Sequence, residues 1–122
     1  MTQPLALLLY ENLLPGTQLA NRLQDLGWRV QTLHEGSALA RLAEEQKPML
    51  VLADLAASRG SVCEGLSGLR KNDSTAHIPV IAFSANESLQ AAAAAAGANL
   101  VVSDTAVLQH LDQFIDQALA DF

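Results

Sequence analysis

Basic residues are scarce in this 122-residue sequence. Seven Lys and Arg residues stand against 13 Asp and Glu residues, which gives a formal net charge of −6. Only two of the basic residues are lysines, Lys47 and Lys71. A protein that binds nucleic acid through phosphate groups needs a basic surface, so this balance argues against nucleic acid as a partner.

Cysteine and long apolar runs are also scarce. Cys63 is the only cysteine, which excludes an intrachain disulfide and a zinc site built from several cysteines. The apolar run over residues 5–10 is too short to span a bilayer, and no Lys or Arg precedes it, which argues against a secretory signal. We therefore expect a cytoplasmic protein without a membrane partner.

The sequence does contain enough apolar residues for a sizeable core. Half of the residues are hydrophobic and 16% are charged, which is typical of a folded chain. A chain of this length buries about two-thirds of its unfolded surface without help from disulfides or metals. We expect one domain spanning residues 1–122.

Short apolar runs alternate with amphipathic segments along the chain. The runs predict buried strands over 5–10, 28–33, 49–53, 78–83 and 100–102. The segments predict a helix opened by Pro15-Gly16-Thr17 and ended by Gly27, and helices over 37–46, from Val62 past Leu69, from Leu89 to Ala96, and over 107–122. The alternation predicts an α/β fold, (βα)5, with a doubly wound five-stranded parallel sheet.

The commonest strand order for such a sheet is 2-1-3-4-5, as in flavodoxin-like folds. Ligands bind there at the carboxyl ends of strands 1 and 3, so we expect Tyr10, Glu11, Asp54 and Ser84 to share one crevice. Glu11 and Asp54 are hard oxygen ligands of the kind that Mg²⁺ takes. Asp54 is also suited to accept a phosphoryl group, to which Ser84 would donate a hydrogen bond.

At these residues the chain resembles the receiver domain of response regulators in bacterial two-component signalling. The resemblance is clearest over residues 48–55 and 69–85, and at Gly97-Ala98. It implies that Asp54 is the position that accepts a phosphoryl group from a histidine kinase and that Ser84 is the switch hydroxyl. It also implies a weak Mg²⁺ site made by Glu11, Asp54 and the main-chain carbonyl of Ala56, with no other cofactor.

Several residues depart from the family pattern. Tyr10 replaces one acid of the acidic pair, Asp104 and Thr105 replace a lysine and the proline after it, and Val101 replaces an aromatic residue. Ser58-Arg59 stands where the family has a Pro-Gly turn. Neither lysine of the chain can replace the missing one, because Lys47 and Lys71 precede the third and fourth strands.

The charge reversal at Asp104 predicts a degenerate receiver that is weakly phosphorylated or not phosphorylated. Such a module works through protein partners, a sensor histidine kinase or a downstream signalling protein. It is not an enzyme beyond phosphoryl acceptance and self-dephosphorylation. The alternative is a functional phosphoacceptor receiver. A flavodoxin-like protein that binds a small ligand is a remote alternative, because the sequence has no glycine-rich phosphate loop.

Three features allow a structural explanation as well. Ser84-Ala85-Asn86-Glu87 has the S-x-x-E pattern of a capping box. Asp104 is suited to cap the last helix. The broad apolar stripe over 107–122 is either a core face or a partner surface, including a homodimer surface shared with the alanine-rich fourth helix and the fifth strand.

Overall fold

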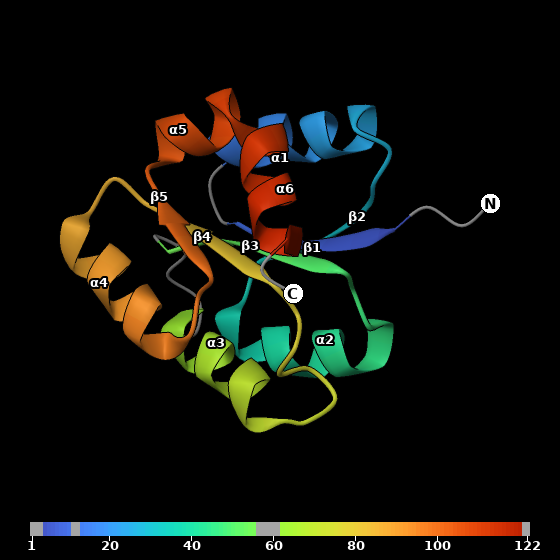
Figure 1. Ribbon diagram of the computed structural model, residues 1–122, viewed down its shortest axis with the longest axis vertical. Helices are drawn as coiled ribbons and strands as arrows, with labels where there is room; N and C mark the ends of the chain where they lie inside the picture. The colour runs from blue at the N-terminus through green and yellow to red at the C-terminus, as the bar shows by residue number, and fades with distance from the viewer. Residues whose placement is uncertain (1–3, 11–12, 56–61, 121–122) are drawn as a thin grey trace.

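The computed structural model describes residues 4–10, 13–55 and 62–120, without the side chains of residues 13–15. Its strands are β1 (Leu5–Leu9), β2 (Arg29–Leu33), β3 (Leu50–Asp54), β4 (Val80–Phe83) and β5 (Leu100–Val102). They form one parallel sheet in the order β2-β1-β3-β4-β5 (Figure 1). The predicted fold class and strand order are confirmed.

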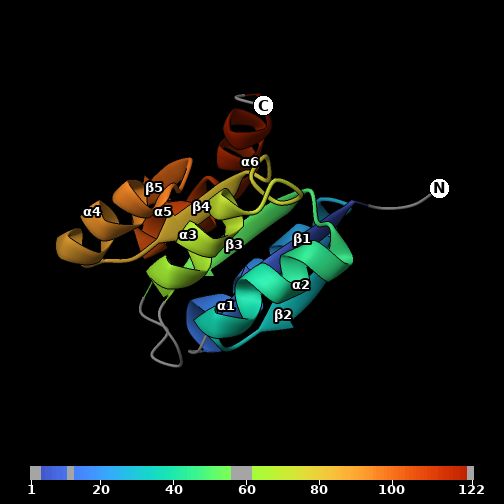
Figure 2. The same ribbon diagram turned by 90° about the horizontal axis from the view of Figure 1, so that it is seen from below.

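Helices cover both faces of the sheet. Helices α1 (Leu13–Asp25), α5 (Asp104–Gln109) and α6 (Leu111–Ala120) lie on one face. The 3₁₀ helix η1 (Gly36–Ala38), α2 (Leu39–Gln46) and α3 (Val62–Lys71) lie on the other, and α4 (Glu87–Ala96) lies beside α3 and β5 (Figures 1 and 2). None of the helices within the described residues is long and apolar enough to cross a membrane.

The alternating side chains of the strands build two cores. The first core lies under α2 and α3 and includes Leu7, Leu9, Val51, Ala53 and Ala82. The second core lies under α1, α5 and α6 and includes Leu8, Tyr10, Leu52, Phe83 and Ile115. Every residue of the central strand β3 is buried, because this strand is covered on both faces. This explains why its sequence is a continuous apolar run that ends in an acid.

The last predicted helix, over 107–122, is wrong as a single element. The chain forms α5 from Asp104 and α6 from Leu111, and His110 between them leaves the helical conformation at φ −127° and ψ 30°. The break changes the direction of the helix axis, so that Val107 on α5 and Ile115 on α6 both reach the second core. Core packing accounts for part of the wide stripe: Leu108, Phe114 and Leu119 are half-buried against the same core.

Two other helices differ from their predicted bounds. Helix α1 begins at Leu13, two residues before Pro15; proline is tolerated in a first turn because its missing N–H would have no partner there. The segment predicted as one helix over 37–46 divides into η1 and α2. Lys47 ends α2 in the left-handed conformation (φ 50°), the only non-glycine residue among the described ones with a positive φ.

Arg70 fastens the amino edge of the sheet. Its guanidinium donates hydrogen bonds to the main-chain oxygens of Gly97 (2.9 Å), Ala76 (3.0 Å) and Ile78 (2.8 Å) and to Oδ1 of Asn99 (2.7 Å). Gly97, the predicted end of α4, adopts φ 111°, and a Cβ atom there would lie 2.7 Å from Cγ of Arg70. Burial lowers the pKa of Arg70 below its ordinary value, and the ring of oxygen acceptors offsets that desolvation.

Candidate functional site at the carboxyl edge of the sheet

Asp54 is the last residue of the central strand, and only 5% of its surface is exposed. It pairs with Phe83 of β4, and the ladder continues one residue further, where Leu55 N donates to the Phe83 oxygen at 3.0 Å. Because side chains alternate along a strand, Asp54 falls on the same face as Leu52, toward the second core. The strand thus presents one buried carboxylate at the carboxyl edge.

Tyr10 follows β1 in the neighbouring position, and its ring belongs to the second core. The ring covers Gly16 of α1 so closely that a Cβ atom on this glycine would overlap it. The ring of His34 meets the Tyr10 ring edge-on, with 5.0 Å between the ring centroids, and Nδ1 of His34 lies 2.8 Å from the main-chain oxygen of Tyr10. Tyr10 is therefore a packed side chain where the receiver pattern has a carboxylate.

Ser84 directly follows β4 and is buried. Its Oγ accepts a hydrogen bond from Asn86 N at 3.0 Å, and its main-chain oxygen accepts one from Nε2 of Gln90 at 2.6 Å. Both bonds use oxygens of Ser84 as acceptors, which leaves its hydroxyl proton as a donor. The predicted capping box is wrong: Asn86 caps α4, because its Oδ1 accepts from the main-chain N–H groups of Ser88 and Leu89.

Asp104 is the first residue of α5 and is half-buried. The predicted capping role belongs to Ser103 instead, whose Oγ accepts from Ala106 N at 3.1 Å. Oδ1 of Asp104 accepts from Thr105 N at 3.0 Å, so the carboxylate lies at the helix start, where negative charge is favourable. The position where the resemblance predicts a lysine thus holds an acid with a local structural use.

Both lysines lie far from this edge. Lys47 follows α2 and leads into the amino end of β3, and Lys71 is the last residue of α3, which returns to the same amino edge. The sequence-based exclusion of a lysine at the carboxyl edge agrees with their places in the fold. Val101, in the aromatic position, is half-buried against the first core.

The metal ligands predicted from the sequence are only partly described. Glu11, Ala56 and Ser58-Arg59 lie outside the described residues. Within the described part of the chain, no three His, Cys, Asp or Glu residues are grouped to hold a metal ion. Of the predicted ligands, the described site therefore supplies one carboxylate, that of Asp54.

Sequence reasoning missed the residues that shape the loops at this edge: His34, Asn86, Gln90 and Ser103. Asn and Ser are strong N-cap residues, so the sequence also allowed Asn86 and Ser103 as caps. They lie two positions after Ser84 and one position before Asp104, the caps that the sequence predicted. The bond from Gln90 to Ser84 and the contact between His34 and Tyr10 depend on how elements meet in space. No local pattern signals them.

Comparison with known proteins shows similarity in structure alone. The chain matches no protein-family model and no curated protein significantly. The receiver domain of the sensor histidine kinase PA1611 from Pseudomonas aeruginosa PAO1, with magnesium coordinated in its active site cleft, superimposes with a TM-score of 0.88. The two chains are 21% identical, and the match covers 98% of this chain and 99% of that one.

Two further structures repeat this result. A putative response regulator from Chloroflexus aurantiacus J-10-fl has a TM-score of 0.87 at 17% identity, with 98% of this chain and 99% of that chain covered. The receiver domain of a signal transduction histidine kinase from Syntrophus aciditrophicus has a TM-score of 0.83 at 15% identity, with coverages of 97% and 91%. The chain thus has the fold of receiver domains.

Proposed function

We propose that the protein is a receiver-like signalling module of the two-component type in which phosphorylation of Asp54 is weak or lost. One observation carries the proposal. Asp54 ends the central strand of a receiver fold, while Asp104 begins α5 and both lysines lie at the opposite edge of the sheet. The scaffold for phosphoryl acceptance is present, but neither lysine lies where it could neutralise the transferred group.

Electrostatics determine how much the missing lysine slows phosphorylation of Asp54. A phosphoryl group in transfer carries negative charge on its equatorial oxygens, and catalysis rests on cations placed around them. Losing one preorganised group of this kind costs about 10²–10³ in rate. Asp104 adds a negative charge at the same edge, so we expect phosphorylation of Asp54 to be slow.

We propose that Mg²⁺ binds weakly, if Glu11 and the Ala56 carbonyl join Asp54 as the sequence predicts. Mg²⁺ prefers one or two carboxylates and keeps several waters. Tyr10 supplies no carboxylate, and its ring is committed to the second core. Magnesium is present in the structurally similar PA1611 receiver domain.

A working phosphoacceptor is the second candidate, and the placement of Ser84 favours it. In this reaction a carboxylate oxygen of Asp54 attacks the phosphorus of a phosphohistidine, the P–N bond breaks, and the imidazole nitrogen leaves with the electron pair. Ser84 lies at the end of the strand beside Asp54 and retains a hydroxyl proton to donate to a phosphoryl oxygen. This candidate requires positive charge from a residue other than lysine, and Arg59, five residues after Asp54 in the sequence, is the candidate for it.

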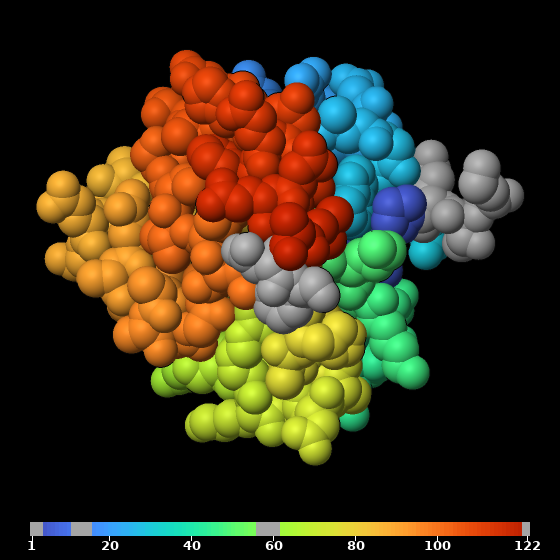
Figure 3. Space-filling view, in the orientation of Figure 1, coloured from blue at the N-terminus to red at the C-terminus, as the bar shows by residue number. Residues whose placement is uncertain are grey.

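For its partners we propose a sensor histidine kinase or a downstream signalling protein. We also propose a homodimer through α4, β5 and the helices α5 and α6, which together replace the predicted last helix. Helix α4 forms an outer margin of the molecule (Figure 3), and its residues Ala91, Ala92, Ala94 and Ala95 are exposed. Strand β5 is the edge of the sheet, and all three of its residues are only half-buried. Sedimentation as a function of concentration tests the homodimer.

The deciding experiment is incubation with acetyl phosphate and Mg²⁺, followed by intact-mass measurement. The degenerate receiver is expected to show slow, partial or no gain of one phosphoryl group. Rapid, stoichiometric gain that disappears in Asp54→Ala would overturn the proposal and establish the working phosphoacceptor. Beryllofluoride with Mg²⁺ provides a second test, since a working receiver would show NMR shifts around Ser84 and α4.

A further inference from the structure

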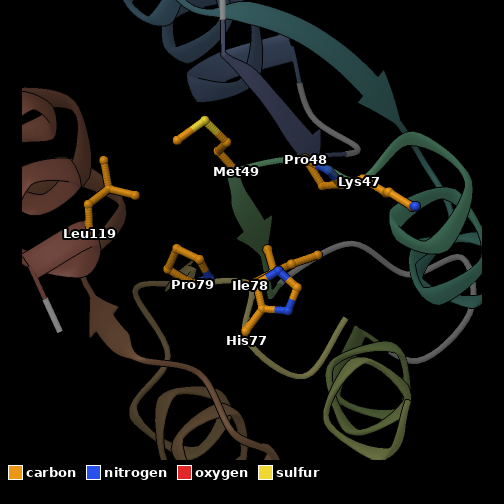
Figure 4. A pocket seen from close by; sticks show the side chains of 7 residues that line it. All are labelled: Lys47, Pro48, Met49, His77, Ile78, Pro79 and Leu119. Atoms are coloured by element: carbon orange, nitrogen blue, oxygen red, sulfur yellow. The ribbon is translucent and has the colours of Figure 1, made fainter. Parts of the chain in front are cut away.

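A pocket of about 410 Å³ lies at the amino edge of the sheet, opposite the edge that carries Asp54. Its volume falls within the range of small-molecule sites. Two three-residue segments and one helix residue line it: Lys47-Pro48-Met49, His77-Ile78-Pro79 and Leu119 (Figure 4). The pocket shares no residue with the carboxyl edge, so a ligand bound in it does not depend on the proposed function.

The two segments are the parallel leads into β3 and β4, and the fold holds both. Met49 N donates to the Leu5 oxygen at 2.8 Å, and Val51 N donates to the Pro79 oxygen at 3.0 Å. Arg70 holds the Ile78 oxygen at 2.8 Å. Each segment also contains a proline, whose φ angle is fixed by its ring. The walls of the pocket are therefore shaped before any ligand arrives.

Apolar and polar side chains lie toward opposite ends of the pocket. Leu119 lies at one end and Lys47 at the other, with Met49 and Pro79 toward the Leu119 end (Figure 4). Met49 is 53% exposed, an unusual state for a large apolar side chain. A flexible thioether at a pocket wall adapts readily to an apolar ligand. One end of the pocket thus offers apolar contact.

The other end carries two exposed polar side chains: the imidazole ring of His77, and Lys47, whose side chain extends outward from the other lining residues (Figure 4). Within the described part of the chain, neither Lys47 nor His77 has a hydrogen-bond or ion-pair partner through its side chain. The described residues of the lining include no carboxylate, although the whole chain carries a net charge of −6. A cation in this setting complements an anion, and the apolar end selects an anion that carries a hydrocarbon body.

We propose that this pocket binds a small amphipathic carboxylic acid. The hydrocarbon part lies against Met49, Pro79 and Leu119. The carboxylate lies toward His77 at the rim, where the flexible side chain of Lys47 turns inward to meet it. A neutral apolar ligand would leave the ammonium unused, and a cationic ligand would be repelled by it. The occupant is a free small molecule; an acidic, apolar peptide segment of a partner protein is the competing occupant, and a binding titration separates the two.

The test is an NMR titration of the ¹⁵N-labelled full chain with 4-phenylbutyrate and, in parallel, with its uncharged amide. Phenylbutyrate is expected to shift the amide signals of residues 47, 49, 77, 78 and 119 in a saturable way. The amide compound is expected to bind about tenfold more weakly, the usual size of one charge-assisted hydrogen bond. Signals around Asp54 and Ser84 stay unchanged.

The two lysines provide a matched pair of variants. Lys47→Asn keeps the helix end intact, because asparagine tolerates the left-handed conformation, and it is expected to weaken phenylbutyrate binding about tenfold. Lys71→Asn, the same change at the other exposed lysine, is expected to leave binding unchanged. His77→Asn provides a second variant in an exposed loop, should Lys47→Asn alter the fold, and is expected to weaken binding of the carboxylate.

Three results would overturn the proposal. One is the absence of saturable shifts at the pocket with phenylbutyrate. The second is equal affinity for the acid and its amide, which would show that the charge has no role. The third is equal weakening by Lys47→Asn and Lys71→Asn. Saturable binding of an acidic, apolar peptide in the absence of phenylbutyrate binding would assign the pocket to a protein partner instead.

Discussion

The side-chain amide of Gln90 in the first turn of α4 donates a 2.6 Å hydrogen bond to the main-chain oxygen of Ser84 at the end of β4. This bond closes the loop between the two elements and ties α4 to Ser84, the proposed switch residue. Any displacement of Ser84 toward a group on Asp54 must therefore strain or break a contact with α4. The geometry links the proposed phosphoryl site to one helix surface.

Gln90→Ala is expected to loosen this loop. The loss of one hydrogen bond at a partly buried site lowers the free energy of unfolding by about 1 kcal/mol. Faster amide hydrogen exchange at residues 84–86 is the local readout, and urea unfolding is the global one. Gln117→Ala, on the exposed side of α6, is the matched control. Equal exchange in the two variants would show that the bond does not hold the loop.

Asn86→Ala is expected to destabilise the protein by about 1 kcal/mol, because the two N–H groups at the start of α4 lose their side-chain acceptor. Glu87→Gln is expected to change stability by less than about 0.5 kcal/mol, since Glu87 closes no capping box. Urea unfolding of both variants measures this. If Glu87→Gln destabilised the protein more than Asn86→Ala, the capping box predicted from the sequence would be correct and the cap by Asn86 would not.

The fold class and the strand order could be predicted from the sequence, because strand burial and helix periodicity are local signals. The continuous apolar run of β3 and the Gly97 stop of α4 were both readable in this way. The bend at His110 was not, since it follows from how α5 and α6 must both reach the second core. Periodicity alone extends one helix through such a bend.

The candidate site was predictable in part for the same reason. Topology alone placed Tyr10, Asp54 and Ser84 at one edge, and the structure brings the strand ends together. Their individual states depend on tertiary contacts: the Tyr10 ring on Gly16, or the Ser84 oxygens held by Asn86 and Gln90. These contacts join residues through packing, which residue spacing does not record.

Arg70→Ala is expected to cost more than about 2 kcal/mol of unfolding free energy, because four oxygen acceptors lose one shared donor. Arg70→Lys is expected to recover only part of this loss, since an ammonium cannot reproduce the planar guanidinium fork. Arg41→Ala, exposed on α2, is the control and is expected to be close to neutral. Urea unfolding compares the three. Full rescue by lysine would mean that charge, and not the fork, holds this edge.

Asp104→Lys tests the charge reversal itself. It places a cation at the start of α5, where the receiver pattern has one, and removes a negative charge from the edge that carries Asp54. The gain of a phosphoryl group from acetyl phosphate is expected to rise at least about tenfold, by intact mass. A small stability loss, about 0.3–1 kcal/mol, accompanies it, because a cation is unfavourable at a helix amino terminus.

Asp112→Lys is the matched control for this prediction. Asp112 lies in the first turn of α6, and its Oδ1 accepts from Gln113 N at 3.0 Å, the same local geometry that Asp104 has with Thr105. The two substitutions therefore change the net charge and the charge at a helix start alike, and they differ in their position relative to Asp54. If both accelerate phosphorylation equally, the effect is one of overall charge. If only Asp104→Lys does, and Asp54→Ala abolishes it, the acid at position 104 is what weakens the phosphoryl site.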